Sequence, residues 1–336
     1  MTRFSDVLGL DIGGANLKAA HTSGVARLEP FALWKNPAGL TQGLQKLLRA
    51  MPDAETLAVT MTGELCDCFE TKRQGVNCIL DAVENLTGKR RIRVWRNDGT
   101  LVDVAAARAA PLLVAAANWL ALAIYAARFA PRGPGLLIDI GSTTTDIVPL
   151  LDGRPVPEAR TDPDRLRNQE LVYLGVKRTP LCALLRGGYA AELFATTLDV
   201  FLLLGSVPED EKNRATADGR SATRAAADAR LARMLCADDE TCTPEQRQRL
   251  AASAAFNLVS QLAKAVETVA GRLPASPQSV VLAGSGEFLA PAVLARQKAF
   301  AVPTVVSLSE RMGPEISQAA CAYALAMLAA ERADDQ

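Results

Sequence analysis

Short apolar runs and longer amphipathic stretches alternate along the whole chain. Runs rich in Val, Ile, Leu and Thr are typical of strands, whereas apolar residues spaced by three and four positions are typical of helices. By this pattern we expect strands over residues 6–12, 17–22, 27–34, 56–62, 91–95, 279–286 and 301–308. We expect helical structure over residues 40–51, 73–88, 104–130, 208–272 and 315–332. This alternation indicates an α/β protein.

A Pro- and Gly-rich segment, PRGPG at residues 131–135, is the clearest break in the pattern. After it come a strand, LLIDI, and a hairpin, TDIVPLLDGRPV, that turns at Asp152-Gly153. The same order of features occurs twice, at residues 8–22 and at residues 136–150: a strand, then Asp-Ile-Gly, then β-rich sequence. We therefore expect two similar domains and a C-terminal helix that returns to the first of them, over residues 1–134, 135–314 and 315–336.

Both repeats contain a loop of small, hydrogen-bonding residues. The first reads VLGLDIGGANLKAA over residues 7–20, and the second reads LLIDIGSTTTDIV over residues 136–148. Glycine lets the backbone approach a phosphate closely, and turn amides with hydroxyl groups bind its oxygens. For either loop alone, a strand that turns a corner is an equally good interpretation. Two such loops in one chain favour a shared phosphate ligand.

Three carboxylates near these loops, Asp11, Asp139 and Asp146, would repel a bare phosphate. A magnesium ion held between carboxylates, waters and phosphate oxygens removes that conflict. The sequence therefore predicts a diphosphate or a nucleotide bound with Mg²⁺, and Lys18 adds a positive charge to the first loop.

The composition of the chain limits the kinds of partner that it can bind. Lys+Arg and Asp+Glu are both 37, so no global field attracts nucleic acid or an anionic membrane. Seven cysteines and an N-terminus without a signal-peptide pattern lead us to expect free thiols and a cytoplasmic location. His21 is the only histidine, so we expect no zinc at Cys66, Cys68 and Cys78. The uncharged residues 109–127 are interrupted by Pro and Asn, and we expect them to form a buried core helix.

With these motifs, the chain resembles the superfamily of acetate and sugar kinases, heat-shock-70 proteins and actin. LGLDIGGANLK resembles its first phosphate loop, LLIDIGSTTTDI its second, and VVLAGSGEFLA at residues 280–290 its adenosine motif. The resemblance implies two ribonuclease-H-like domains with the ligand in the cleft between them. Ala15-Asn16 stand where phosphotransferases often have Thr or Ser, and Ser285 replaces a third Gly. These departures favour a diphosphate ester over ATP.

Four further stretches narrow the resemblance: MTGELCDCFETKRQGV (61–76), ELVYLGVKRTPL (170–181), TADGR (216–220) and ARLARMLCADDE (229–240). They are similar to hydantoinase/oxoprolinase-related proteins linked to tetrahydromethanopterin-dependent one-carbon transfer, which act in methanofuran and methylofuran synthesis. The implied reaction joins an aminomethylfuran-methyl diphosphate to the phenol of γ-glutamyltyramine, or of a tyrosine-derived analogue, and releases pyrophosphate. The alternatives are an ATP-dependent kinase or amidohydrolase of the same fold, and a nucleotide-gated regulator.

The resemblance also implies roles by position. We expect Asp11, Asp139 and Asp146 to orient Mg²⁺, and the diphosphate to contact Gly13, Gly14, Asn16, Lys18, Gly141, Ser142, Thr143 and Thr144. Gly284 and Gly286 of the adenosine-like motif are further candidates for ligand binding. Glu64 is the candidate base for the phenol, and a solvated turn or a helix cap is an equal alternative. Candidates for the glutamyl carboxylates, each of which a solvated surface also explains, are Lys72, Arg73, Lys177 and Arg178.

His21 is expected to be structural. We expect small-molecule substrates only, with no nucleic acid and no membrane as partner, and we leave a homodimer open.

Overall fold

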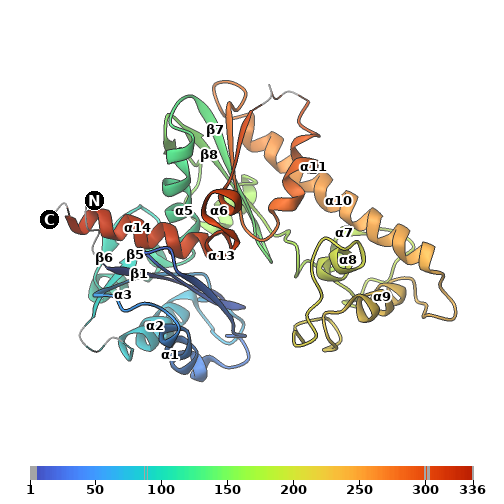
Figure 1. The fold of residues 1–336 in the computed structure, drawn as a ribbon, viewed down its shortest axis with the longest axis horizontal. Helices are drawn as coiled ribbons and strands as arrows, with labels where there is room; N and C mark the ends of the chain where they lie inside the picture. The colour runs from blue at the N-terminus through green and yellow to red at the C-terminus, as the bar shows by residue number, and fades with distance from the viewer. Residues whose placement is uncertain (1–5, 87, 89, 299, 301–302, 335–336) are drawn as a thin grey trace.

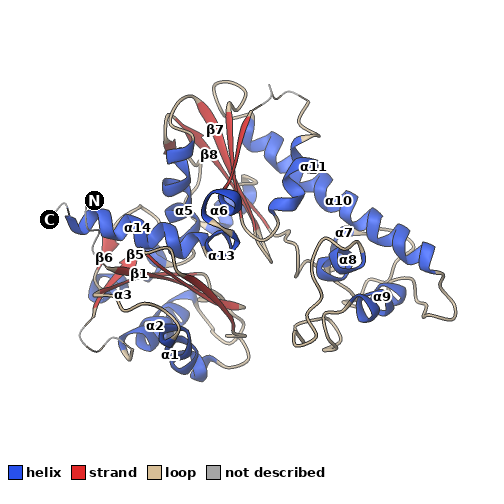
Figure 2. Cartoon of the chain, viewed as in Figure 1, coloured by secondary structure: helices blue, strands red, loops and turns tan. Residues whose placement is uncertain are grey.

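The computed structural model describes residues 6–86, 88, 90–298, 300 and 303–334. Two sheets form its centre (Figures 1 and 2). The first sheet has the order β3-β2-β1-β4-β5-β6. Its strands are β1 (Val7–Ile12), β2 (Asn16–His21), β3 (Ala26–Pro30), β4 (Thr56–Met61), β5 (Arg91–Trp95) and β6 (Leu101–Val102).

The second sheet repeats this topology. Its order is β10-β8-β7-β11-β12, and β9 also pairs with β8. The strands are β7 (Pro134–Ile140), β8 (Thr145–Leu151), β9 (Arg154–Pro155), β10 (Leu171–Val172), β11 (Ser279–Ala283) and β12 (Thr304–Ser307). In the first sheet, β1 is antiparallel to β2 and parallel to β4. In the second sheet, β7 is likewise antiparallel to β8 and parallel to β11. The predicted α/β class with two ribonuclease-H-like sheets is confirmed.

Helices cover both faces of the first sheet, and this explains its continuous apolar strands. Every residue of β1 and of β4 is buried, as is typical of parallel strands between two helical layers. One face packs on α1 (Leu40–Arg49) and α2 (Lys72–Glu84). The other packs on α14 (Ala320–Asp334), whose backbone lies so close that a Cβ at Gly9 would be 2.0 Å from the Ala322 carbonyl oxygen.

The alanine-rich region expected as one core helix is broken into four pieces: α3 (Val104–Ala109), α4 (Pro111–Val114), α5 (Asn118–Ala126) and η2 (Ala127–Phe129). Pro111 lacks an N–H and begins a new helix. Ala116 then takes a left-handed conformation, with φ 47°, while Ala115 bridges to Met61. The expected single helix is therefore wrong, although its burial is correct. None of the described helices has the length and apolar character needed to cross a bilayer.

Helices α5 and α14 lie between the two sheets. One hydrophobic cluster joins them to Val7 of the first sheet and to Leu137 and Val281 of the second. The last helical stretch is also divided, into α13 (Pro314–Gln318) and α14, at the buried Ala319. Helix α14 contacts β1 and β2 of the first sheet, as expected of a helix that returns to the first domain. The domain boundaries themselves remain a prediction.

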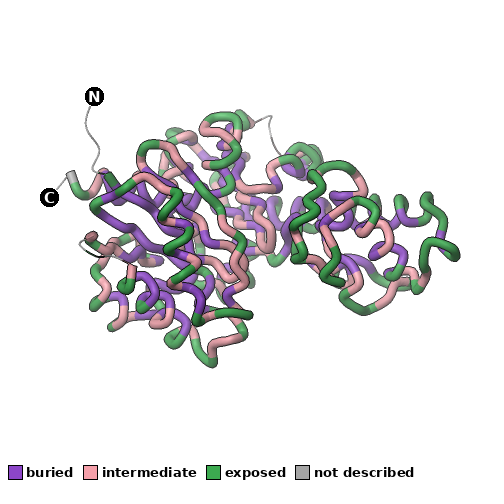
Figure 3. Tube along the Cα trace, turned by 60° about the horizontal axis from the view of Figure 1, so that its bottom comes forward, coloured by how far each residue is buried: buried purple, intermediate pink, exposed green. Residues whose placement is uncertain are grey.

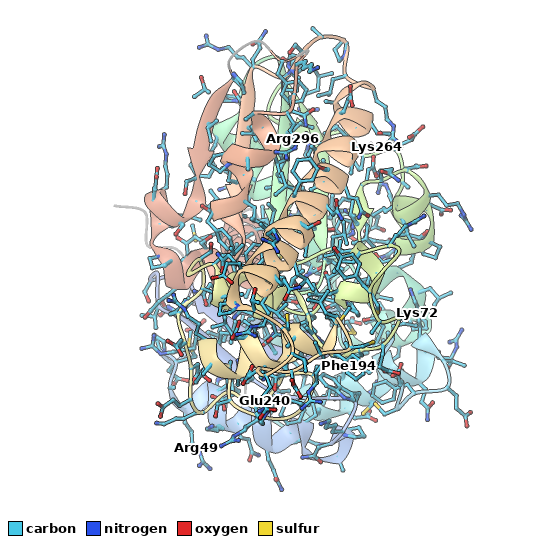
Figure 4. The ribbon with its side chains drawn as sticks, turned by 90° about the vertical axis from the view of Figure 1, so that its right-hand side faces the viewer. Arg49, Lys72, Phe194, Glu240, Lys264 and Arg296 are labelled. Atoms are coloured by element: carbon cyan, nitrogen blue, oxygen red, sulfur yellow. The ribbon has the colours of Figure 1, made fainter. Side chains whose placement is uncertain are left out.

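A helical lobe extends from the second sheet, at the right of Figure 1. It holds α7 (Leu181–Leu184), α8 (Thr197–Leu203), α9 (Arg224–Arg233) and α10 (Pro244–Ala270). The helical prediction for 208–272 is right for α9 and α10, but the residues before α9 form a loop. Figure 4 looks onto this lobe, with Glu240 at its near end and Lys264 on α10 above it.

The remaining short helices are η1 (Pro37–Gly39), α6 (Asp162–Arg167), η3 (Glu287–Leu289), α11 (Ala290–Leu294) and α12 (Leu308–Met312). The strand expected over 27–34 ends at Pro30, because the Phe31 and Leu33 N–H groups instead donate to the Ala15 and Gly14 carbonyls. Buried residues concentrate in the sheets and the helices between them, and the lobe has a buried interior of its own under an exposed surface (Figure 3).

Candidate functional site

Two hairpin loops close in the same way. In the first, between β1 and β2, the Gly13 N–H donates to the Asn16 carbonyl at 3.0 Å. In the second, between β7 and β8, the Gly141 N–H donates to the Thr144 carbonyl at 2.8 Å. A Cβ at either glycine would lie about as close to that same carbonyl oxygen, at 3.0 and 3.1 Å. Glycine therefore avoids a tight contact at the first position of each loop, and the residues of both loops stay half-exposed.

Asp11 sits on β1 directly before the first loop and is 3% exposed. Across the hairpin it pairs in register with Lys18, whose Nζ lies 3.7 Å from Asp11 Oδ2. Burial raises the pKa of Asp11, and Lys18 and the Asn118 side chain offset this only in part. Burial lowers the pKa of Lys18, but Asp11, Cys321 and Asp139 together outweigh this effect, and the net direction is upward. Asp11 Oδ1 is buried without a hydrogen-bond partner.

Asp139 occupies the equivalent position before the second loop. Its partner in register is a second acid, Asp146. Burial, followed by the charge of Asp146, raises the pKa of Asp139 to about 7. Asp11 also contributes to this shift, and Lys18 opposes it, so the two hairpins present their charged groups to one common region.

Asp146 has a cationic partner of its own. Arg165 of α6 is 1% exposed, and its Nη2 lies 2.8 Å from Asp146 Oδ1. The Arg165 guanidinium carbon lies 3.8 Å from the centroid of the Trp119 ring. Asp146 is thus next to Asp139 but bound in an ion pair, and its predicted role as a metal ligand stays a prediction.

The adenosine-like segment closes over the second carboxylate. Gly284 has φ +88°, and a Cβ there would be 2.3 Å from Asp139 Oδ1. The Gly286 N–H donates to the Ile140 carbonyl at 2.8 Å. The next residue, Glu287, accepts hydrogen bonds from the Ser307 and Ser317 hydroxyls. This segment is therefore packed against the predicted site, with its acid engaged in holding the flanking helices.

Glu64 follows β4 and is 1% exposed. The cap of α2 is Thr71, which accepts from the Gln74 N–H, so the solvated-turn and helix-cap alternatives for Glu64 are wrong. Burial raises the pKa of Glu64 to about 7, against the lowering effects of its own backbone N–H and of Lys72. Its Oε2 is buried without a hydrogen-bond partner. A buried carboxyl that titrates near neutrality suits a general base.

The four cations proposed for carboxylate binding are not equivalent. Lys72 is half-buried and acts electrostatically on Glu64. Arg73 is exposed and lines a separate cavity of about 610 Å³ between α1 and α2. Lys177 and Arg178 are exposed beside the second loop. His21 is buried, and its Nδ1 accepts from the Ser23 N–H at 3.1 Å, in keeping with a structural role.

Sequence reasoning missed several neighbours of the site. Asn118 interacts with Asp11, and Arg165 neutralises Asp146. Asp162 and Tyr173 act electrostatically on each other near Glu64. The sequence contained a signal for Asn118 alone, since it is the single polar residue in an uncharged stretch. The others lie in ordinary charged segments, and only the fold brings them to the loops.

Two cysteines lie near carboxylates of the candidate site, Cys66 near Glu64 and Cys321 near Asp11 and Asp139. A Cβ at Gly14 would be 2.7 Å from Cys66 Sγ, and Cys68 Sγ donates to the Leu33 carbonyl at 3.7 Å. Cys321 of α14 is buried, and the charges of Asp11 and Asp139 add to the burial that raises its pKa. All seven thiols are free.

The donor set fits a magnesium ion that is shared with a phosphate. Within the described ranges, no three His, Cys, Asp or Glu side chains gather closely enough to hold a metal alone. Mg²⁺, however, is commonly bound by one or two carboxylates together with water and substrate phosphates. The unpartnered Asp11 Oδ1 and the raised pKa of Asp139 are both relieved by a cation. Magnesium binding stays a prediction that these two residues support.

Known proteins are similar to this chain along almost its full length. Residues 55–332 match the family model described as Hydantoinase/oxoprolinase. The chain is 33% identical over 341 residues to the (4-{4-[2-(gamma-L-glutamylamino)ethyl]phenoxymethyl}furan-2-yl)methanamine synthase of Methanocaldococcus jannaschii, with 98% of each chain covered. A synthase of the same name from Methanococcus vannielii is 29% identical over 201 residues, which cover 57% of this chain and 89% of the relative.

One solved structure shares the fold. A nucleotide-free acetone carboxylase superposes with a TM-score of 0.55 at 11% identity, covering 96% of this chain and 70% of that one. The activator of 2-hydroxyisocaproyl-CoA dehydratase from Clostridium difficile, with bound ADPNP, gives a TM-score of 0.46 at 13% identity, covering 98% of this chain and 97% of that one. At these identities the likeness concerns the fold alone.

Proposed function

We infer the function of this chain from the premise that it belongs to the hydantoinase/oxoprolinase family, as the match over residues 55–332 shows. We propose that it is a transferase of methanofuran or methylofuran synthesis. It would condense an aminomethylfuran-methyl diphosphate with the phenol of γ-glutamyltyramine, or of a tyrosine-derived analogue, and release pyrophosphate. The observation that carries the proposal is the 33% identity to the archaeal synthase along 98% of both chains.

The proposed reaction is a substitution at the CH₂ group that joins the furan to the diphosphate. The phenol oxygen forms the new C–O bond, and the C–O bond to the diphosphate breaks. The electron pair leaves with pyrophosphate, and the phenolic proton passes to a base. The furan ring can spread positive charge from the reacting carbon, so the main tasks of the protein are to position the reactants and to stabilise the leaving group.

The two hairpin loops suit the leaving group. Backbone amides beside Gly13 and Gly141, together with the Lys18 ammonium, offer donors and positive charge to phosphate oxygens. Asp11 and Asp139 would hold a magnesium ion, which when bound supplies Lewis-acid stabilisation of the departing pyrophosphate. Without a cation, the carboxylates of the second hairpin would repel the diphosphate.

Glu64 suits the proton transfer. A phenol has a pKa of about 10, so at neutral pH it needs a base as its oxygen attacks. With its pKa raised to about 7, the Glu64 carboxylate is a stronger base than an exposed glutamate and is still about half ionised at neutral pH.

The direct test is an assay with purified protein, aminomethylfuran-methyl diphosphate, Mg²⁺ and γ-glutamyltyramine. We expect pyrophosphate and the ether product, detected by mass, in equal amounts. A parallel reaction replaces the diphosphate ester with ATP and aminomethylfuran-methanol. Phosphate release that depends on ATP, without ether formation from the diphosphate, would reject the proposal in favour of the kinase or amidohydrolase alternative.

A further inference from the structure

Four side chains beside the loops take no part in the reaction steps above, although Arg178 is one of the candidates for the glutamyl carboxylates. They form a group that we call the collar: Trp34, Leu65, Tyr173 and Arg178. Leu65 is 57% exposed and Tyr173 is 58% exposed. The Arg178 guanidinium carbon lies 4.8 Å from the centroid of the Trp34 ring. Large apolar groups exposed next to a polar site indicate a surface that contacts a ligand.

Two members of the collar are fixed to the first loop. The Leu33 N–H, next to Trp34, donates to the Gly14 carbonyl at 2.9 Å. The Gly63 N–H donates to the Ile12 carbonyl at 3.0 Å, and the Cys66 N–H donates in turn to the Gly63 carbonyl at 3.2 Å. The backbone on both sides of Glu64 and Leu65 is therefore tied to the strand and loop that carry Asp11.

The other two members are fixed to the second loop. The Val176 N–H donates to the Gly141 carbonyl, and the Lys177 and Arg178 N–H groups both donate to the Ser142 carbonyl, at 3.0–3.1 Å. A Cβ at Gly175 would be 2.5 Å from the Ser142 carbonyl carbon, so the segment lies directly on the loop. Tyr173 and Arg178 thus have positions set by the backbone of the predicted diphosphate site.

The two halves of the collar meet beside the buried base. Arg178 reaches across to Trp34. Burial raises the pKa of the Tyr173 hydroxyl, and Asp162 and Glu64 add to this effect while Arg178 opposes it. The collar therefore combines aromatic and aliphatic surface with one cation, and it flanks a carboxyl whose Oε2 has no partner.

We propose that the collar is the binding site of the phenolic acceptor. Tyr173, Leu65 and Trp34 would contact its aromatic ring, and Arg178 would face the carboxylate at its other end. This inference rests on the proposed function, because the attacking phenol must lie beside both the diphosphate carbon and the base. Rings pack best offset or edge to face, and a guanidinium held over an aromatic ring can still donate to a carboxylate.

The test measures binding without turnover. Calorimetry with γ-glutamyltyramine is performed in the presence of pyrophosphate and Mg²⁺, and γ-glutamylethylamine, which lacks the ring, serves as the control ligand. We expect Tyr173→Ala and Leu65→Ala to weaken γ-glutamyltyramine binding by about tenfold each, the scale of a lost ring contact. Tyr173→Phe should bind almost as well as the native protein. Leu112→Ala is the matched control, since Leu112 is 60% exposed on α4, outside the collar.

The same variants separate this inference from the proposed reaction. In steady-state assays, loss of the collar should raise KM for the phenolic amine and leave KM for the diphosphate within about twofold. Absence of ether formation, with the amine still bound through Tyr173, would reject the reaction and keep the collar. Unchanged binding in Tyr173→Ala and Leu65→Ala, or failure of the native protein to bind γ-glutamyltyramine, would overturn the collar proposal. Thermal melts confirm that each variant is folded.

Discussion

The two hairpin loops are closed by equivalent backbone hydrogen bonds, but the charged side chains beside them differ. In the first, the aspartate before the loop faces a lysine across the strands, Asp11 and Lys18. In the second, the equivalent aspartate faces another aspartate, Asp139 and Asp146. The first hairpin therefore carries its own cation, whereas the second concentrates negative charge beside a half-buried carboxyl.

This difference separates two tasks that a diphosphate site must perform. The Lys18 ammonium offers positive charge to phosphate oxygens directly. Asp139, with its pKa raised to about 7, is a carboxyl that gains most from an added metal ion. Arg165 pairs with Asp146 from outside the hairpin but leaves Asp139 without a cation of its own. We infer that Asp139 of the second hairpin depends most on the metal ion that it would share with Asp11, whereas Lys18 of the first hairpin acts on the phosphate.

The largest expected effect comes from removing the carboxylate of the second hairpin. Asp139→Asn should lower kcat/KM by roughly 10²-fold or more, the scale of a lost preorganised electrostatic contact, and EDTA should abolish turnover of the native enzyme. Steady-state kinetics measure both. Asp239→Asn is the control, because Asp239 lies in the lobe with a mostly exposed side chain. A near-native rate for Asp139→Asn would show that the second loop is not a metal site.

Removing the cation of the first hairpin should have the next largest effect. Lys18→Met leaves Asp11 buried without its ion-pair partner and takes a positive charge from the phosphate site. We expect KM for the diphosphate to rise by about tenfold, corresponding to roughly 1.4 kcal/mol, and the Mg²⁺ requirement to persist. Lys18→Arg, which keeps the charge, should recover part of the loss. Equal activity in both variants would mean that the charge of Lys18 does not act on the ligand.

The raised pKa of Asp139 should be visible in the stability of the protein. The folded state keeps a proton on this carboxyl that the unfolded state, with an ordinary pKa of 3.8, releases. The free energy of unfolding should therefore fall as pH rises from about 4 to about 7, and then level off. The upper limit is about 4 kcal/mol at 1.36 kcal/mol per pKa unit. Urea unfolding of native protein and Asp139→Asn at pH 5 and pH 8 tests this.

Asp139→Asn should lose that part of the pH dependence. Glu64→Gln should lose a similar part, because the pKa of Glu64 is also raised to about 7. If the free energy of unfolding varied with pH in the same way for the native protein and both variants, the burial of these carboxyls would be contradicted.

The last prediction concerns ligand choice. If the site favours a diphosphate, pyrophosphate with Mg²⁺ should stabilise the fold by about 2.7 kcal/mol at a hundred times its Kd. ATP at equal concentration should stabilise it less. A thermal-shift series with both ligands measures the difference, and Lys18→Met should reduce the pyrophosphate shift. A larger shift with ATP, accompanied by phosphate release, would favour the nucleotide-dependent alternatives.

Much of this arrangement follows from local sequence. A buried strand, Asp-Ile-Gly and a second strand define each hairpin, because glycine avoids a tight contact where the loop closes and the side-chain alternation of a two-strand pair fixes the register. The same repetition identified the two similar sheets. Local pattern also indicated Asp11, Lys18 and Asp139 as candidates, since they lie within a few residues of the loops.

Tertiary structure alone decided the rest. Glu64 follows a strand as many solvated turn residues do, yet it is buried, and α2 packs so closely that a Cβ at Gly75 would be 2.2 Å from the Glu64 carbonyl oxygen. Asn118 reaches Asp11 because the alanine-rich segment breaks at Ala116 instead of continuing as one helix. Arg165 and Tyr173 come to the loops from distant segments. Burial and long-range charge depend on which elements pack together, and periodicity along one chain does not encode those contacts.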